Sequence, residues 1–149
     1  MTTRNILSLL KPKGDIVFLK DSQPLRKGLE KLRLHGYTAI PVIDDEGMYV
    51  GTVNEGDFLW HLLDTGDFDV KRRKCGFVRD VLRPGWNPPV TIDTTMEDLL
   101  LRVMEQNFVP VIDDRGVFVG IITRRDVMIC FHKMLYANEA SLQCSAENS

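Results

Sequence analysis

The first half of the chain alternates short apolar segments with helical stripes of apolar residues. Three segments have the length of buried strands, at residues 16–19, 39–43 and 48–53. One helical stripe lies between the first two segments, and a second stripe follows the third. The residues that we expect these two helices to bury are Leu25, Leu29, Leu32, Phe58, Leu59, Leu62 and Leu63. The order strand, helix, strand, strand, helix predicts mixed α and β structure.

Polar residues and glycines indicate where these elements begin and end. Asp21 or Ser22 is placed to cap the first helix, with Pro24 in its first turn and Gly36 at its end. Gly47 supplies the positive φ that a hairpin between the second and third strands needs. A second helix is expected to start near residue 54.

The second half of the chain shows the same order of elements. Apolar segments at residues 90–92, 108–112 and 117–122 predict its strands, and a last helix is expected over about residues 124–135. Thr94 and Glu97 have the spacing of a capping box. This box is expected to open the first helix of the second half, which should face the core with Met96, Leu99, Leu100 and Val103.

The two halves are copies of one another. Residues 41–57 recur as residues 110–126, and nine of these seventeen positions are identical without a gap. A duplicated half-chain predicts two similar units about a pseudo-two-fold axis, with related clefts where they meet. The fold class expected is therefore α/β (α+β), built from two β-α-β-β-α repeats.

Composition narrows the function classes. The formal net charge of −2 argues against a nucleic-acid surface, and we interpret the basic run at residues 71–74 as a solvated linker. No apolar stretch approaches the ~20 residues of a membrane span, and the first residues do not resemble a signal peptide. Three cysteines without a CxxC motif fit a reducing cytoplasm. The three histidines lack the close spacing of a metal site, so none is expected.

Two short motifs contain the candidate chemistry. Residues 36–42 read Gly-Tyr-Thr-Ala-Ile-Pro-Val, a glycine turn and a hydroxyl just before a buried strand. Residues 120–126 read Gly-Ile-Ile-Thr-Arg-Arg-Asp, a strand that runs into a helix N-terminus. Thr123 and Asp126 crowd that first turn, which favours anions, and an ionised Asp126 can accept both hydroxyls of a ribose. The same spacing is also that of a capping box, so a purely structural role stays open.

Together with the duplication, these motifs resemble a tandem pair of cystathionine-β-synthase (CBS) domains over about residues 12–135. The resemblance implies two repeats packed sheet to sheet, a disc-shaped homodimer, and adenosine-containing ligands bound between the repeats by a sensor without chemistry of its own. The first site that it implies comprises Lys13, Asp15, Ile16, Tyr37, Thr38, Ala39, Ile40, Pro41, Thr123, Arg124, Arg125 and Asp126. The second, weaker site comprises Asn54, Asp57, Asn107, Phe108, Val109 and Pro110, together with residues 86–89. Glu55 stands in that second site where Arg124 stands in the first, and it would repel a phosphate.

The hypothesis that follows is a stand-alone regulatory protein of the cytoplasm, of the bacterial type. It would bind an adenine nucleotide (AMP, ADP or ATP) as a regulatory ligand, use no cofactor, and signal to an unidentified effector protein. The alternatives are a cyclic di-AMP receptor and a ligand-free interaction module. A ribose diol facing Asp126 favours a mononucleotide, because a cyclic dinucleotide ties up its 3′ oxygen. An enzyme is disfavoured, since the common catalytic motifs are absent from the sequence.

The organisation expected from the sequence has four parts. Residues 1–70 form repeat 1 with an N-terminal segment, residues 71–85 a linker, residues 86–135 repeat 2, and residues 136–149 a disordered tail.

Overall fold

The computed structural model describes residues 5–66 and 76–147, with side chains as far as Ala137. Its strands form two separate sheets. One sheet contains β2 (Leu19–Lys20), β3 (Ala39–Ile43) and β4 (Tyr49–Asn54), in that order. The other has the order β1, β7, β6, β5, with β1 at Lys11–Pro12, β5 at Val90–Thr91, β6 at Phe108–Ile112 and β7 at Phe118–Thr123. The basic run at residues 71–74 lies outside the described residues.

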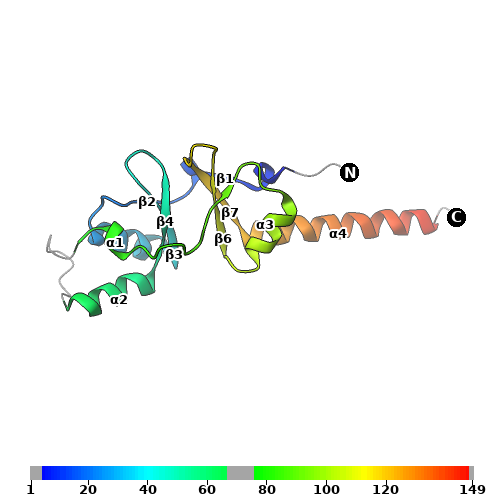
Figure 1. Cartoon of the computed structure of the whole chain (residues 1–149). Coiled ribbons are helices and arrows are strands. Elements are labelled where there is room, and N and C mark those ends of the chain that lie inside the picture. The colour runs from blue at the N-terminus through cyan, green and yellow to red at the C-terminus, as the bar shows by residue number, and fades with distance from the viewer. Residues whose placement is uncertain (1–4, 67–75, 148–149) are drawn as a thin grey trace.

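Four α-helices in the described residues cover the two sheets from outside. They are α1 (Leu25–His35), α2 (Glu55–Thr65), α3 (Met96–Val103) and α4 (Arg124–Glu147). Figure 1 shows α1 and α2 on one side of the central pair of sheets and α3 with the start of α4 on the other. The order β-α-β-β-α predicted for each repeat is therefore confirmed, as are the bounds of β3 and β6.

The two repeats meet through their hairpins in a reciprocal way. Tyr49 N–H donates to the carbonyl of Gly116 at 3.3 Å, and Phe118 N–H donates to the carbonyl of Gly47 at 2.9 Å. Tyr49 and Phe118 occupy equivalent positions in the two repeats, and so do Gly47 and Gly116. The rings of Tyr49 and Phe118 also stack, with centroids 6.0 Å apart. Exchanging one repeat for the other preserves these contacts, as the predicted pseudo-two-fold axis requires.

The segment that leads into each repeat packs on the core of the other repeat. Ile6, which precedes repeat 1, is 0% exposed and belongs to the core of repeat 2. Val78 and Val81, which precede repeat 2, are buried in the core of repeat 1, where the 3₁₀ turn η4 (Val78–Val81) places them. The sequence predicts an N-terminal segment within repeat 1 and a linker at residues 71–85, and no local pattern indicates that each segment packs on the other repeat.

Several element boundaries differ from the predictions. Repeat 1 begins its sheet only at Leu19, and Pro24 itself is the N-terminal cap of α1, with no side-chain bond from Asp21 or Ser22. Thr95 rather than Thr94 caps α3. Gly36 does end α1 in the left-handed conformation, as predicted. These shifts are small because the apolar pattern fixes the buried faces more strongly than the ends.

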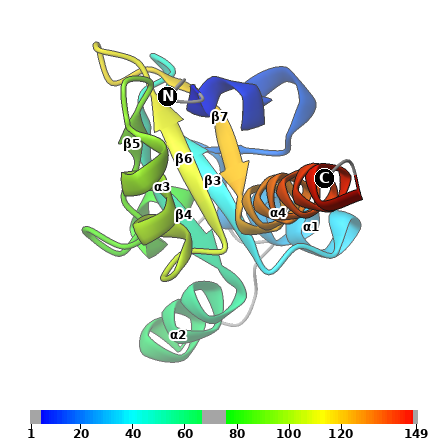
Figure 2. The same cartoon turned by 90° about the vertical axis from the view of Figure 1, so that its right-hand side faces the viewer.

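Two predictions about the helices were wrong, one about buried residues of α2 and one about the end of α4. Leu59 and Leu63 on α2 were expected in the core, but their side chains are 53% and 49% exposed. The last helix was expected to end near Leu135 and the tail to be disordered, whereas α4 continues to Glu147. Figure 2 looks along α4 from its C-terminal end, and Figure 1 shows that the helix projects beyond the sheets.

Candidate functional site

Sheet register brings the start of one strand beside the start of a helix in each repeat. Ala39 in β3 pairs with Asn54, the residue before α2, and Phe108 in β6 pairs with Thr123, the residue before α4. The helix that follows then donates its first N–H to the turn before the strand. This bond runs from Arg124 N–H to the Asn107 carbonyl at 2.8 Å. The two motifs of each repeat therefore lie together.

A cleft of about 310 Å³ lies where these strand and helix starts from the two repeats meet. Its lining residues are Lys11, Asp15, Ile16, Val17, Tyr37, Thr38, Ala39, Pro41, Asn107, Phe108, Ile121 and Thr123. The structure thus brings together seven of the residues predicted for the first site: Asp15, Ile16, Tyr37, Thr38, Ala39, Pro41 and Thr123. We call this space the first cleft.

The other five predicted residues do not line the first cleft. Ile40 is 0% exposed in the core of repeat 1, because successive strand residues point to opposite faces. Lys13 lies over the ring of Phe18, with Nζ 5.1 Å from the ring centroid. Arg124, Arg125 and Asp126 lie at the start of α4, beside the cleft.

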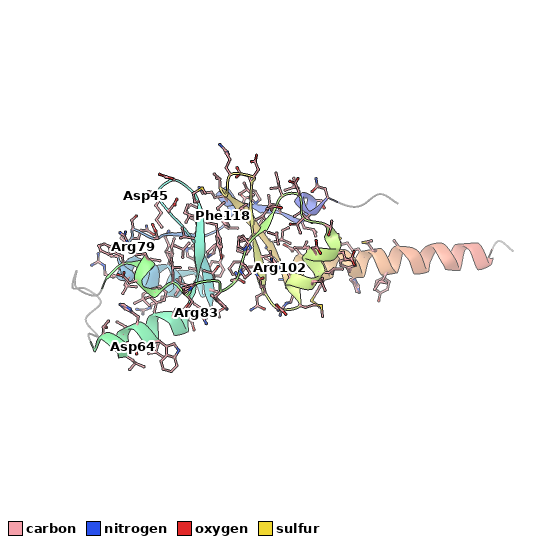
Figure 3. All side chains as sticks on the ribbon, in the orientation of Figure 1. Asp45, Asp64, Arg79, Arg83, Arg102 and Phe118 are labelled. Atoms are coloured by element: carbon pink, nitrogen blue, oxygen red, sulfur yellow. The ribbon has the colours of Figure 1, made fainter. Side chains whose placement is uncertain are left out.

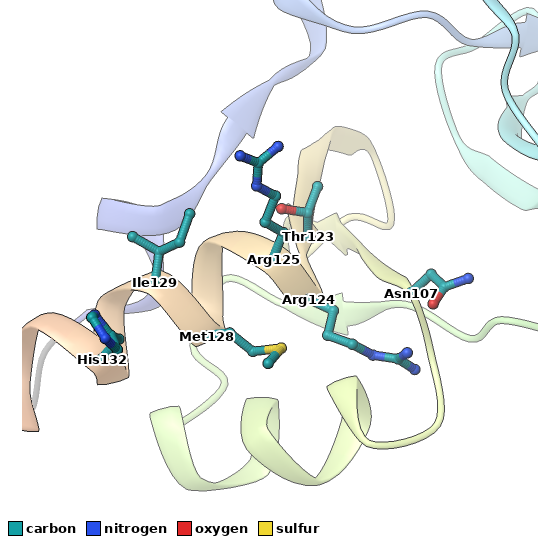
Figure 4. Close-up of a pocket in the computed structure, with 7 residues that line it drawn as sticks. All are labelled: Asn107, Thr123, Arg124, Arg125, Met128, Ile129 and His132. Carbon is teal, nitrogen blue, oxygen red and sulfur yellow. The ribbon is translucent and has the colours of Figure 1, made fainter.

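Arg124 and Arg125 point in different directions from the first turn of α4. Figure 4 shows Arg125 beside Thr123, toward β1, and Arg124 on the Asn107 side. Arg124 Nε donates to the carbonyl of Val103 at 2.6 Å, so this guanidinium satisfies the end of α3. The predicted pair of phosphate-binding arginines is therefore not assembled in the first cleft. Both instead line a shallow surface depression of about 560 Å³ on α4.

Two backbone N–H groups in the first turn of α4 are already hydrogen-bonded within the protein. Asp126 N–H donates to Thr123 Oγ1 at 3.1 Å, so the capping role of the threonine is present in this structure. The N–H of Arg124 is also bonded, to the Asn107 carbonyl. Fewer N–H groups are therefore available for an anion than the sequence suggested. The carboxylate of Asp126 faces Lys11, with Oδ2 3.6 Å from Nζ.

Sequence reasoning missed Lys11, a cation in the lining of the first cleft. It lies in β1, a two-residue strand that pairs antiparallel with Ile121 and Gly120 of β7. Two residues carry no periodic signal, so the sequence gave no indication of this pairing. Asn107 and Phe108, assigned by sequence to the second site only, also line the first cleft.

The residues predicted for the second site are dispersed. Val109 and Pro110 are buried residues of β6 itself. Asn54 and Asp57 form a reciprocal capping box at the start of α2. Asn107 and Phe108 instead line a neighbouring cleft of about 530 Å³, which we call the second cleft. Its further lining includes Trp86, Asn87 and Pro88, which the sequence did assign to this site, and Arg102, Glu105, Gln106 and Arg124, which it did not.

A buried polar network joins the second cleft to the hairpin contact. The Tyr49 hydroxyl donates to the Asn87 carbonyl at 2.8 Å and lies 2.7 Å from Thr52 Oγ1. The Asn87 amide bonds both Thr52, at 3.1 Å, and Gln106, at 2.9 Å. Burial raises the pKa of Tyr49 to about 12, although the bonds with Thr52 and Asn87 act to lower it. Asn87 itself holds a left-handed φ of 56°, which the network stabilises.

The part of the chain that the structure describes contains neither a metal-binding cluster nor a membrane-spanning helix. Residues 5–66 and 76–147 contain no group of three or more His, Cys, Asp or Glu side chains arranged to hold a metal ion. In the same ranges, every helix is too short or too polar to cross a bilayer.

Comparison with known proteins decides the family. The model of the CBS domain matches residues 6–64 and again residues 78–133, which together cover most of the chain. The chain belongs to the CBS domain family. The two matched segments correspond to the two repeats, so the molecule contains a tandem CBS pair.

Solved structures with the same fold include other CBS-pair proteins. CbpB in complex with cyclic di-AMP superposes with a TM-score of 0.86 at 22% identity, over 93% of this chain and 91% of that one. A CBS domain protein from Streptococcus pneumoniae TIGR4 gives a TM-score of 0.77 at 24% identity, over 87% of each chain. CBSX2, which is from Arabidopsis thaliana, in complex with AMP gives 0.70 at 26% identity, over 87% and 97%.

One curated relative is an uncharacterised protein of Methanopyrus kandleri, 24% identical over 102 residues. The match covers 66% of this chain but only 48% of that protein, so the chain spans about half the length of the curated relative it matches.

Proposed function

We propose that this CBS pair is a regulatory module that binds an adenine nucleotide in the first cleft and signals to an effector protein. The observation that carries the proposal is the composition of that cleft. Tyr37, Thr38 and Ala39 from repeat 1 face Thr123 from repeat 2 across one space. A volume of about 310 Å³ lies at the lower end of the range for small-molecule pockets, about 300–1,000 Å³.

The lining, together with Asp126 in the first turn of α4, supplies each part of a nucleotide with a chemically suitable group. Ile16, Val17 and Ile121 offer an apolar slot for a base. Asp126 is bonded through its N–H to Thr123 of the lining, and its carboxylate can accept the two hydroxyls of a ribose once Lys11 moves aside. Lys11 then becomes the cation that a phosphate needs, in place of the arginines expected from the sequence.

Cyclic di-AMP is the second candidate. The first and second clefts share Ala39, Asn107 and Phe108 in their linings, so a ligand with two adenosines has adjoining spaces to enter. A relative of the same fold, CbpB, was solved with this ligand. A mononucleotide remains our first choice, because Asp126 suits a ribose with both hydroxyls free.

A homodimer is part of the proposal. Apolar side chains on the outer surfaces of α2 and α4 are largely exposed, including Trp60 at 64% and Met128 at 63%. Leu59 and Met128 occupy equivalent positions in the two repeats, so the two helices present related surfaces. Surfaces of this kind commonly mark protein interfaces. A second copy of the chain satisfies both at once through a two-fold axis.

Thermal unfolding with AMP, ADP, ATP, cyclic di-AMP, NAD and S-adenosylmethionine tests the function. A ligand at ~100 times its dissociation constant adds about 2.7 kcal/mol to the free energy of unfolding, which raises the midpoint by several degrees. We expect a selective shift with an adenine nucleotide, and its loss in the double variant Thr123→Ala, Asp126→Ala. A flat panel for the wild-type protein would refute nucleotide binding and favour a ligand-free interaction module.

A further inference from the structure

Each repeat holds its helix-capping aspartate against a cation that comes from the segment leading into the other repeat. Asp57 at the start of α2 pairs with Arg83, which precedes repeat 2. Asp126 at the start of α4 pairs with Lys11, which precedes repeat 1. The two aspartates are equivalent by the internal duplication. The two ion pairs are therefore related by the pseudo-two-fold axis, and their differences can be compared directly.

The pair in repeat 1 is closed. Arg83 Nε lies 2.7 Å from Asp57 Oδ1, and the Asp57 side chain is only 4% exposed. The second carboxylate oxygen, Oδ2, accepts the N–H of Asn54 at 2.9 Å. Arg83 also stacks on Trp86, with its guanidinium carbon 4.1 Å from the ring centroid. Both oxygens of Asp57 are thus engaged, and the Trp86 ring makes a further contact with the arginine. Figure 3 labels Arg83 on the linker between the repeats.

The pair in repeat 2 is open. Lys11 Nζ lies 3.6 Å from Asp126 Oδ2, beyond hydrogen-bonding distance, and the two side chains are 51% and 30% exposed. An exposed pair at that separation is weak and screened by salt. A buried carboxylate with a short charge-assisted bond is costly to uncover. The hydroxyls of a ribose can therefore displace Lys11 from Asp126 more easily than Arg83 from Asp57.

We propose that Arg83 determines which of the two repeat-equivalent positions accepts a ribose, by occupying the carboxylate of Asp57. This inference rests on the proposed nucleotide function of the first cleft and deepens it. The chain then binds one adenosine-containing ligand, at the Asp126 position. From the sequence, we expected Glu55 to weaken the second site by repelling a phosphate. In the present proposal, the cause is Arg83, which occupies the carboxylate of Asp57.

The test is the number of adenosine molecules bound per chain, measured by equilibrium dialysis at saturation. Adenosine is the probe because it has the ribose diol but no phosphate for Glu55 to repel. The variant is Arg83→Leu, which keeps an apolar contact with Trp86 and removes the donors. Arg79→Leu is the matched control, since Arg79 is an exposed arginine of the same segment that stacks on Phe77 instead. Circular dichroism verifies the fold, and Arg83→Gln replaces the leucine variant if that one unfolds.

We expect one adenosine per chain for the wild-type protein and for Arg79→Leu, and two for Arg83→Leu. Adding Asp57→Ala to Arg83→Leu should restore one, because the gained site uses that carboxylate. A folded Arg83→Leu protein that still binds one adenosine overturns this inference and leaves the proposed function standing. Two adenosines on the wild-type protein overturn it as well. A wild-type protein that binds no adenosine overturns this inference, and the proposed function falls with it only if the thermal panel of nucleotides is flat as well.

Discussion

Substituting Gly120 by alanine should detach the N-terminal segment from repeat 2. A Cβ atom at this position would collide with the backbone carbonyl oxygen of Lys11, and it would lie 3.0 Å from Leu10 Cδ1. Backbone in a paired strand cannot rotate away as a side chain can. Strand β1 must therefore separate from β7, and Ile6, which is 0% exposed, must leave the core of repeat 2.

The repeat supplies a matched control in Gly51. Its φ of 157° is nearly the same as the 158° of Gly120, so the backbone cost of adding a side chain cancels between the two variants. A Cβ atom at Gly51 meets only the side chain of Leu82, at 3.0 Å, and that half-buried leucine can move. Comparing the two variants isolates the consequence of detaching β1.

The expected magnitude follows from the burial of Ile6. Fully burying an isoleucine side chain contributes about 1.5–3 kcal/mol, so Gly120→Ala should be about 2 kcal/mol less stable than Gly51→Ala. At this chain length that difference lowers the unfolding midpoint by about 4–8 °C. Thermal unfolding followed by circular dichroism measures it, and amide exchange over residues 5–12 should accelerate in Gly120→Ala only. Equal midpoints, or an unchanged rate of amide exchange over residues 5–12, would refute the conclusion that the segment leading into repeat 1 is anchored in the core of repeat 2.

Three further predictions concern stability and pH. Ile6→Ala should destabilise the protein by about 2–5 kcal/mol in urea unfolding, whereas Leu7→Ala, whose side chain is 40% exposed, should cost far less. Because the pKa of Tyr49 is raised from 10.0 to about 12, its stabilisation is complete below pH 10 and declines by about 2–3 kcal/mol toward pH 12; Tyr49→Phe should lack that decline. Partial burial acts to raise the pKa of Asp113, but the Val117 and Arg115 N–H groups and the Arg115 guanidinium hold it below 3.8. Its stabilisation is therefore present above pH 3.8 and lost as pH falls further, so Asp113→Asn should be less stable than wild type near neutrality and converge with it in acid; parallel pH curves would contradict this.

The elements that could be predicted from the sequence are those with a local signal. The strands at Ala39–Ile43 and Phe108–Ile112 were predicted to the residue, because an apolar run ends at a turn whose glycine needs positive φ. The first strand of repeat 1 was placed poorly, at residues 16–19 instead of Leu19–Lys20, since it contains only two residues and depends on a partner far along the chain. The first strand of repeat 2 was predicted to within one residue. The exposed surface of α2 was also missed, because an apolar stripe does not reveal whether its contact lies within the chain or in a partner.

The candidate site likewise contains residues that the sequence could predict and residues that only the packing of distant segments brings together. Tyr37, Thr38, Ala39, Pro41 and Thr123 line one cleft because the duplication fixes how the repeats face each other. Arg124 did not, because its direction depends on the Val103 carbonyl, which only packing of α3 brings near. The roles of Lys11 and Arg83 could not be predicted from the sequence, since each pairs with a carboxylate of the repeat that it does not belong to. Contacts of this kind have no sequence spacing from which to infer them.

The most direct test of the central claim is a crystal structure of the protein grown with the nucleotide that stabilises it most in the thermal panel. We expect one adenosine unit in the first cleft, with the ribose hydroxyls on Asp126, Lys11 displaced toward the phosphate and the Arg83–Asp57 pair intact. Density for the nucleotide only outside that cleft, or a ribose bound at Asp57 while Asp126 stays paired with Lys11, would contradict it.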